Sequence, residues 1–216
     1  MSFFKALNRL QDKAVKVYKD RTRDLYKDFL EGLAPLVKKP EHKEYIAKGL
    51  NDIAKKQEKE ADEVLETMSK RYLNNKREIK KIMKERWSDV HYSDRIWKEK
   101  KKLKKILLKE IKNGVDVDKK EVLIRKISKK LDTSIFNAER LINTELTNVM
   151  AKSMIKSAEI YGKKHYKIGV VMDDRTSDVC KDIYSANEIY KLSEARTGVN
   201  LPPFHVSCRS RVIIVD

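Results

Sequence analysis

Two short segments near the carboxyl end of the chain hold the side chains best suited to chemistry. Cys180 lies in the first segment, and His205 and Cys208 lie three residues apart in the second. Thiolate sulfur and imidazole nitrogen are ligands that zinc prefers, and the His-x-x-Cys spacing lets one turn supply two of them. Three alternatives fit these residues: a zinc site, a metal-free cluster with small buried thiols, and a Cys180–Cys208 disulfide. We expect the metal-free cluster, with no cofactor required and zinc as the alternative.

Catalysis by these segments has little support. His205 and a cysteine could form a nucleophile–base pair, but no third group at a recognisable spacing would orient the histidine. Asp173, Asp174 and Asp178 could instead hold a divalent cation in a small metal-dependent nuclease. Clustered acids after a strand are also common in turns, so we expect the chain not to be an enzyme.

The elements that must position these side chains are mostly helical. Apolar residues recur at helical spacing over residues 4–30 and again over 41–73, and Pro35 and Pro40 separate the two patterns. This arrangement predicts an antiparallel hairpin of two long helices within residues 1–75. The apolar stripe of the first helix consists of Leu7, Leu10, Ala14, Val17, Leu25 and Phe29.

Further helices are predicted from the turn and capping signals that follow. Asn113-Gly114 should end one helix, because both residues tolerate the left-handed conformation. A capping box at Asp118–Glu121 should begin a second helix. Thr133 or Ser134 should then cap a third helix that ends near Gly162. The sequence thus predicts a basic helical segment over residues 76–131 before the last module.

Residues 132–216 are expected to form a small α+β module. Residues 166–172 and 211–215 are rich in β-branched residues and read as two strands that should pair antiparallel. Such pairing would bring residues 173–180 close to residues 202–209, and so gather the two cysteines and the histidine. The predicted fold is therefore mostly α, with a long N-terminal hairpin, basic helices and a small C-terminal module with an antiparallel strand pair.

The charge of the chain indicates a polyanionic partner. The 50 Lys and Arg against 33 Asp and Glu leave a net charge of +17, of which +12 falls within residues 76–130. No apolar run approaches the roughly 20 residues that cross a bilayer, so no membrane partner is expected. Two cysteines are too few for a disulfide scaffold, which favours a reducing cytoplasm. The lysines expected to contact double-stranded DNA are Lys98, Lys100, Lys101, Lys102, Lys104 and Lys105.

The two C-terminal motifs resemble the C-terminal domain of phage head-morphogenesis proteins, the minor head proteins similar to protein F of phage Mu. That family typically reads Asp-x-Arg-Thr-Cys-x-x-Cys, then Pro-Pro-x-His-x-x-Cys-Arg-Cys. The chain departs from this pattern at Ser177 and Ser210, where the family usually has cysteines, while Asn143–Thr147 resembles its Arg-Thr-Glu-Thr helix segment. The matching residues are Asp173, Arg175, Thr176, Cys180, Pro202, Pro203, His205, Cys208 and Arg209.

The resemblance covers roughly residues 90–216 and implies a minor head protein of a tailed phage or prophage. Such a protein would be present in few copies, associate with the portal and act in head assembly and in DNA packaging or ejection. Its expected partners are the portal protein and double-stranded DNA, with the scaffold or major capsid protein as further candidates. It would reside inside the head of the virion, and in the host cytoplasm during assembly. The alternative is a free-standing basic DNA-binding protein, which neighbouring genes would distinguish.

Within this module we expect residues of the two C-terminal motifs, together with Glu145, to form a structural clasp. Arg175 and Arg209 are expected to bond Glu145 or Asp174 and so tie the module to the preceding long helix. The residues assigned to the clasp are Glu145, Asp173, Asp174, Arg175, Thr176, Cys180, Pro203, His205, Cys208 and Arg209.

Overall fold

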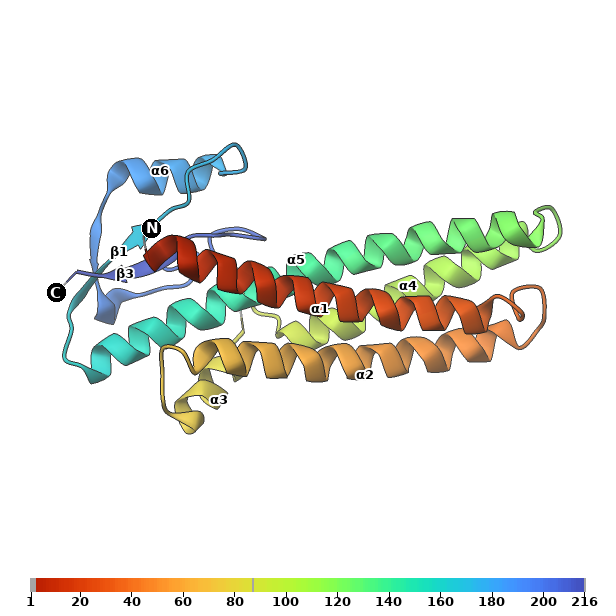
Figure 1. Ribbon diagram of the computed structural model, residues 1–216, viewed down its shortest axis with the longest axis horizontal. Helices are drawn as coiled ribbons and strands as arrows, with labels where there is room; N and C mark the ends of the chain where they lie inside the picture. The colour runs from red at the N-terminus through yellow and green to blue at the C-terminus, as the bar shows by residue number, and fades with distance from the viewer. Residues whose placement is uncertain (1–2, 87, 216) are drawn as a thin grey trace. The chain divides into compact units, whose positions relative to one another are not determined.

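A computed structural model describes residues 3–86 and 88–215 of the chain. Within these residues the chain forms six α-helices and three short strands, so the prediction of a mostly α fold with a small α+β module is confirmed (Figure 1). The helices are α1 (Phe3–Leu33), α2 (His42–Ser69), α3 (Lys76–Lys84), α4 (Tyr92–Gly114), α5 (Lys120–Ile160) and α6 (Asp178–Ala186). The strands are β1 (His165–Gly169), β2 (Ile189–Lys191) and β3 (Arg211–Ile214), and a 3-10 turn, η1, spans Leu192–Glu194.

The helices and strands divide between two compact units. The helical unit consists of Val15–Ala61 and Val90–Glu139, and the mixed unit consists of Met1–Ala14, Asp62–Asp89 and Arg140–Asp216. This division differs from the three consecutive segments expected from the sequence, 1–75, 76–131 and 132–216. Each of α1, α2 and α5 contributes one part to each unit.

The helical unit packs segments of α1, α2, α4 and α5 side by side (Figure 1). The Gln57 amide donates a hydrogen bond to the Thr22 hydroxyl at 3.1 Å, and the rings of Phe29 and Tyr45 stack with centroids 5.6 Å apart. These contacts pair earlier residues of α1 with later residues of α2, which confirms the predicted antiparallel hairpin. The core of this unit includes Phe29, Leu33, Ile46, Leu50, Leu103, Leu107, Ile111, Leu123 and Ile127.

The buried face of α1 differs from the predicted stripe. Val17 was expected inside but is 41% exposed, whereas Val15 and Tyr18 on either side of it are buried. At about 100° per residue, Val15 and Tyr18 lie about 60° apart around the helix, whereas Val17 lies about 160° from Val15, so one face cannot hold all three. Gln11, a polar residue, is only 1% exposed. The side chain of Leu7, another residue of the predicted stripe, lies outside the described part of the chain.

The predicted end of α4 is confirmed, but the reason is different. The helix ends at Gly114, and neither Asn113 nor Gly114 has a positive φ. A Cβ at Gly114 would lie 2.5 Å from the Asp118 carboxylate and 2.9 Å from the Leu123 side chain. A side chain at Gly114 would therefore displace the ends of these two side chains, whereas the backbone here is not left-handed.

The expected helix boundary at Thr133 or Ser134 is wrong, because α5 continues through both residues for 41 residues in all. The Thr133 hydroxyl donates to the Lys129 carbonyl at 3.1 Å, within the same helix. Ser134 is buried and lies 2.6 Å from the Tyr26 hydroxyl. Both hydroxyls thus find partners without ending the helix.

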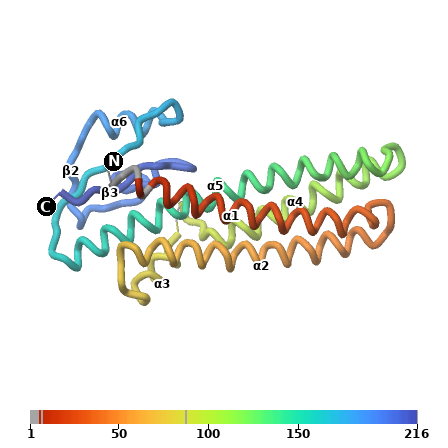
Figure 2. Tube along the Cα trace, in the orientation of Figure 1, coloured from red at the N-terminus to blue at the C-terminus, as the bar shows by residue number. Residues whose placement is uncertain are grey.

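The mixed unit is built on a three-stranded antiparallel sheet of order β2-β1-β3 (Figure 2). Tyr166 of β1 lies opposite Ile214 of β3, and Gly169 lies opposite Arg211, which confirms the predicted strand pair. The edge strand β2 was not predicted. The core beside this sheet consists of Ala151, Ile155, Ala158, Tyr166, Ile168, Leu192, Leu201 and Val212.

Candidate functional site

The turn after β1 delivers Cys180 to the interior of the mixed unit. The buried hydroxyl of Thr176 donates to the Val171 carbonyl at 2.7 Å and accepts from the Asp173 amide at 2.8 Å, which holds the turn closed. Ser177 then caps α6 by accepting the Cys180 amide at 3.3 Å. Cys180 consequently lies in the first turn of α6 with only 3% of its surface exposed.

Two threonines of α5 hold the second segment in place. The Thr147 hydroxyl donates to the Cys208 carbonyl at 2.7 Å, and the Ser207 amide donates to the Thr144 hydroxyl at 2.9 Å. The Cys208 amide also donates to the His205 carbonyl at 3.2 Å, which closes a turn between the two candidate ligands. The threonines of the Asn143–Thr147 segment therefore serve to fix the loop that carries His205 and Cys208.

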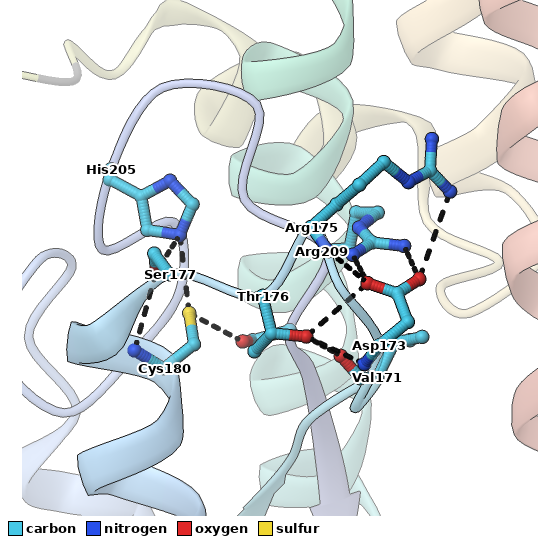
Figure 3. Close-up of polar contacts among 9 residues, drawn as sticks. Val171, Asp173, Arg175, Thr176, Ser177, Cys180, His205 and Arg209 are labelled. Carbon is cyan, nitrogen blue, oxygen red and sulfur yellow. Dashed lines mark hydrogen bonds and ion pairs between the residues drawn. The ribbon is translucent and has the colours of Figure 1, made fainter.

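The predicted meeting of the two cysteines and the histidine is observed. The Cys180 Sγ atom lies 3.2 Å from the His205 Nε2 atom (Figure 3). It lies 3.9 Å from the Cys208 Sγ atom. Both cysteines are free, so the disulfide alternative is not the one this structure shows. Ser177 and Ser210 border the cluster, with hydroxyls 2.8 Å from His205 Nε2 and 3.3 Å from Cys180 Sγ respectively.

The two thiols do not titrate alike. The hydrogen bond from Cys180 lowers the pKa of the Cys208 thiol to about 5, and the same contact raises the pKa of Cys180. Burial works against ionisation of both thiols. The cluster therefore holds a thiolate more readily at Cys208, with the Cys180 thiol as its hydrogen-bond donor.

The arginine of the second motif bonds a different acid from the two expected. Arg209 makes a two-pronged ion pair with Asp173, with nitrogen–oxygen distances of 2.7 and 2.5 Å. Arg175 lies 3.8 Å from the same carboxylate (Figure 3). The expected partners, Glu145 and Asp174, are respectively buried in α5 and exposed. The clasp therefore joins the two C-terminal segments to each other through Asp173, and the threonines join the second segment to α5.

The lysines expected to bind DNA lie on α4 and differ in exposure. Lys98, Lys101, Lys102 and Lys105 are exposed, and Lys104 is half-buried. The expectation for Lys100 is wrong, because this side chain is only 3% exposed.

Lys100 lies on the face of α4 that packs into the helical unit. Its ammonium donates to the Glu99 carboxylate at 2.5 Å and lies 3.5 Å from the Ser134 hydroxyl. The same ammonium lies 5.4 Å from the centre of the Tyr26 ring. Burial lowers the pKa of Lys100, and no phosphate could reach it in this fold.

Comparison with known proteins agrees with the motifs. A family model described as Phage Mu protein F like protein matches residues 101–213, just over half of the chain. The chain belongs to this family. No curated protein matches the chain, and no solved structure does. The suspected resemblance is thus confirmed, and it indicates a phage head morphogenesis protein.

The region matched by the Phage Mu protein F family spans most of α4, all of α5 and the whole cluster of Cys180, His205 and Cys208. Helices α1, α2 and α3 precede it, so the sequence comparison carries no information on them. Among residues 3–86 and 88–215, no helix is long and apolar enough to cross a membrane. In the same part of the chain, this cluster is the one group of three or more candidate metal ligands. Asp173, Asp174 and Asp178, the aspartates of the nuclease alternative, do not form a second group of that kind.

Two buried side chains that the sequence analysis did not single out, Arg211 and Gln11, form hydrogen bonds beside the family's motif. Arg211 is 5% exposed, and its guanidinium donates to the Ser210 carbonyl at 3.0 Å and to the side chain of Gln11. Burial lowers the pKa of Arg211. The Gln11 amide also donates to the Asn143 carbonyl at 3.2 Å. The one signal in the sequence was a glutamine at a helical position flanked by the apolar stripe of α1.

Acid should weaken the clasp through Asp173. The Arg209 guanidinium holds the pKa of Asp173 well below its ordinary value of about 3.9. A carboxyl with a lowered folded-state pKa contributes stability above its unfolded-state pKa and loses that contribution as the pH falls below it. We therefore expect Asp173→Asn to lower the melting temperature at pH 7, with a difference from wild type that shrinks as the pH falls from about 5 to 3.

The control for this titration is Asp174→Asn, at the exposed neighbouring carboxyl. Thermal melts of the three proteins across the pH series would measure the difference. An equal loss for both variants, or a loss for Asp173→Asn that is constant with pH, would contradict the role of the Arg209–Asp173 pair.

Proposed function

We propose that the chain is a minor head protein of a tailed phage or prophage that associates with the portal and contacts DNA without reading its sequence. The observation that carries the proposal is the match of residues 101–213 to the Phage Mu protein F family. A head protein of this kind works beside densely packed phosphate, and the net charge of +17 suits that environment.

The DNA contact is supported by a row of exposed lysines along α4. Lys98, Lys102, Lys105, Lys109 and Lys112 are all exposed, and we call them the lysine row. Their spacing of four and three residues places them within about 80° of one another around the helix and over about 21 Å of its length. The buried residues Ile96, Leu103 and Leu107 lie on the opposite face. Within residues 3–86 and 88–215, no ion pair neutralises a member of the row at 4.0 Å or less.

A row of this kind binds phosphates but carries no base-reading groups. Lysine ammonium groups neutralise phosphates and release counterions, which gives affinity that depends on salt and not on sequence. Lys109 and Lys112 were not among the lysines expected, although their exposure and spacing are equivalent to those of Lys98 and Lys105. The proposed contact is therefore longer than the sequence suggested and excludes Lys100.

The portal is the proposed protein partner, and the scaffold and major capsid protein are further candidates. This assignment derives from the family resemblance. The apolar face of the α1–α2 hairpin is buried within the helical unit, so that face is not offered to a partner. We further propose that the clasp is structural and not catalytic, since Asp173 is occupied by Arg209.

The proposal is tested in the phage that encodes the chain, by deleting its gene and supplying the protein in trans. We expect deletion to reduce the yield of infectious particles, and wild-type protein to restore it. Mass spectrometry should detect the chain in purified heads in few copies, and cross-linking in those heads should join it to the portal. A chain that is absent from purified heads, or a deletion with a normal yield of infectious particles, would rule out a role in the virion.

A further inference from the structure

We propose that Cys180, His205 and Cys208 form a zinc site with three protein ligands and one open coordination position. The three side chains come from the first turn of α6 and from the loop before β3, and their ligand atoms all lie within 4.8 Å of one another. The sequence alone favoured a metal-free cluster; the geometry changes that preference.

Two of the three distances among the ligand atoms are close to the edges of a zinc tetrahedron. Zinc binds sulfur at about 2.3 Å and imidazole nitrogen at about 2.0–2.1 Å, which places two sulfurs about 3.8 Å apart and a sulfur and a nitrogen about 3.6 Å apart. The observed distances are 3.9 Å between the sulfurs of Cys180 and Cys208, and 3.2 Å between Cys180 Sγ and His205 Nε2. A bound ion would need adjustments of only a few tenths of an ångström along these two edges. The third pair, His205 Nε2 and Cys208 Sγ, lies within 4.8 Å and would have to close by up to about 1.2 Å.

The histidine is held in the form that a metal requires. Its Nδ1 atom lies 2.9 Å from the Val206 carbonyl, which can only accept, so Nδ1 carries the proton. In the neutral ring Nε2 is then the acceptor, 2.8 Å from the Ser177 hydroxyl and 3.2 Å from Cys180 Sγ (Figure 3). Zinc-bound histidines commonly donate their other nitrogen to a backbone carbonyl in this way.

Hydrogen bonds support the cluster, and a small pocket borders two of its three side chains. Thr147 holds the Cys208 carbonyl, and Ser177 caps the turn that carries Cys180. A small surface pocket is lined by Cys180, His205, Ser177 and Ser210, together with Arg175 and Arg209. Cys208 does not line this pocket and is buried beneath the surface. Serine hydroxyls are not usual zinc ligands, so water is expected at the fourth position, as in other sites with three protein ligands.

The binding reaction is balanced without any redox step. Zn²⁺ displaces the thiol protons of Cys180 and Cys208 into solvent, up to two per ion, while His205 supplies a neutral lone pair. Two thiolates neutralise the charge of the ion, so the occupied site adds no net charge to the interior of the mixed unit.

The test uses the full-length protein, purified without chelator, with metal content measured by elemental analysis and affinity measured by competition with a chromophoric chelator. We expect one zinc per chain, and visible absorption typical of tetrahedral thiolate coordination when cobalt replaces zinc. Cys208→Ser and His205→Ala should each weaken zinc binding by about 100-fold or more. His165→Ala, at a histidine of β1 outside the cluster, should leave one zinc per chain.

A folded wild-type protein that contains no zinc and binds none when zinc is added would overturn the proposal. Retention of tight binding by Cys180→Ser or Cys208→Ser would do the same. If a variant fails to fold, the wild type alone decides the question, because removal of zinc by a chelator should lower its melting temperature and added zinc should restore it. These measurements do not involve DNA or phage heads, so their outcome is independent of the proposed function.

Discussion

Replacing the five residues of the lysine row with glutamine is expected to flatten the salt dependence of duplex DNA binding by about 4–5 in the slope of log affinity against log salt, at about 0.9 for each phosphate contact. Between 50 and 200 mM salt, the wild type should thus lose about 500-fold more affinity than the variant. The reason is that Lys98, Lys102, Lys105, Lys109 and Lys112 lie exposed on one face of α4. Fluorescence anisotropy with duplexes of unrelated sequence across a salt series would measure both slopes.

The matched control changes the same number of charges elsewhere in the helical unit. The five control residues lie on α1 and α2 and are all exposed: Lys16, Lys27, Lys48, Lys55 and Lys59. Their replacement with glutamine should alter the slope by much less, because net charge alone does not create phosphate contacts. Equal flattening by both sets would show that the affinity follows overall charge, and an unchanged slope for the lysine row would remove α4 from the DNA contact.

Lys100 provides a second control on the same helix. Its ammonium is buried against Glu99 and Ser134, so Lys100→Gln should leave the salt slope unchanged. The same change should lower the free energy of unfolding by about 1–3 kcal/mol, because a buried partner loses its hydrogen bond. One lysine of a basic helix is thereby predicted to affect folding and not binding.

Gln11→Ala is expected to lower the free energy of unfolding by about 2–4 kcal/mol. The Gln11 amide bonds the Asn143 carbonyl and the Thr147 hydroxyl, both at 3.2 Å, and its carbonyl accepts from Arg211. Removing it leaves the guanidinium of Arg211 buried with fewer acceptors, which is costly for a charged group. Urea denaturation followed by circular dichroism would measure the loss.

Lys13→Ala, two residues along α1 and exposed, is the matched control and should change stability by less than about 0.5 kcal/mol. A loss that is equally small for Gln11→Ala would show that the start of α1 does not belong to the mixed unit. The same reasoning predicts that a fragment of residues 88–216 does not unfold cooperatively, since it lacks Gln11 and the buried Ile79 and Ile82 of α3.

Local patterns accounted for part of the secondary structure and for part of the site. The spacing of apolar residues predicted the α1–α2 hairpin, and β-branched residues flanked by turn signals predicted the pairing of β1 with β3. Because Cys180 and His205 each lie close along the chain to one of these strands, the pairing itself was enough to predict that they meet. These features depend on contacts between near neighbours or between adjacent strands, which residue type and spacing reveal.

Failures of prediction occurred where side chains from distant parts of the chain compete for one position. Ser134 carries a strong capping signal, but Tyr26 bonds its hydroxyl across the helical unit and α5 continues. Arg209 pairs with Asp173 and not with Asp174, although the two acids are neighbours of the same type in the sequence. The conformation of the folded turn determines which of the two carboxylates faces the guanidinium.

The amino-acid sequence by itself determined the helical character of this protein, its excess of positive charge, its family and the identity of its three candidate metal ligands. Only the tertiary structure decided which lysines face solvent, that Gln11 and Arg211 share the interior of one unit, and how far apart the ligand atoms lie. The physical reason is that composition and periodicity record the free energy of local conformation and burial on average. Which atoms touch depends on packing between segments that are more than a hundred residues apart, as Gln11 and Asn143 are.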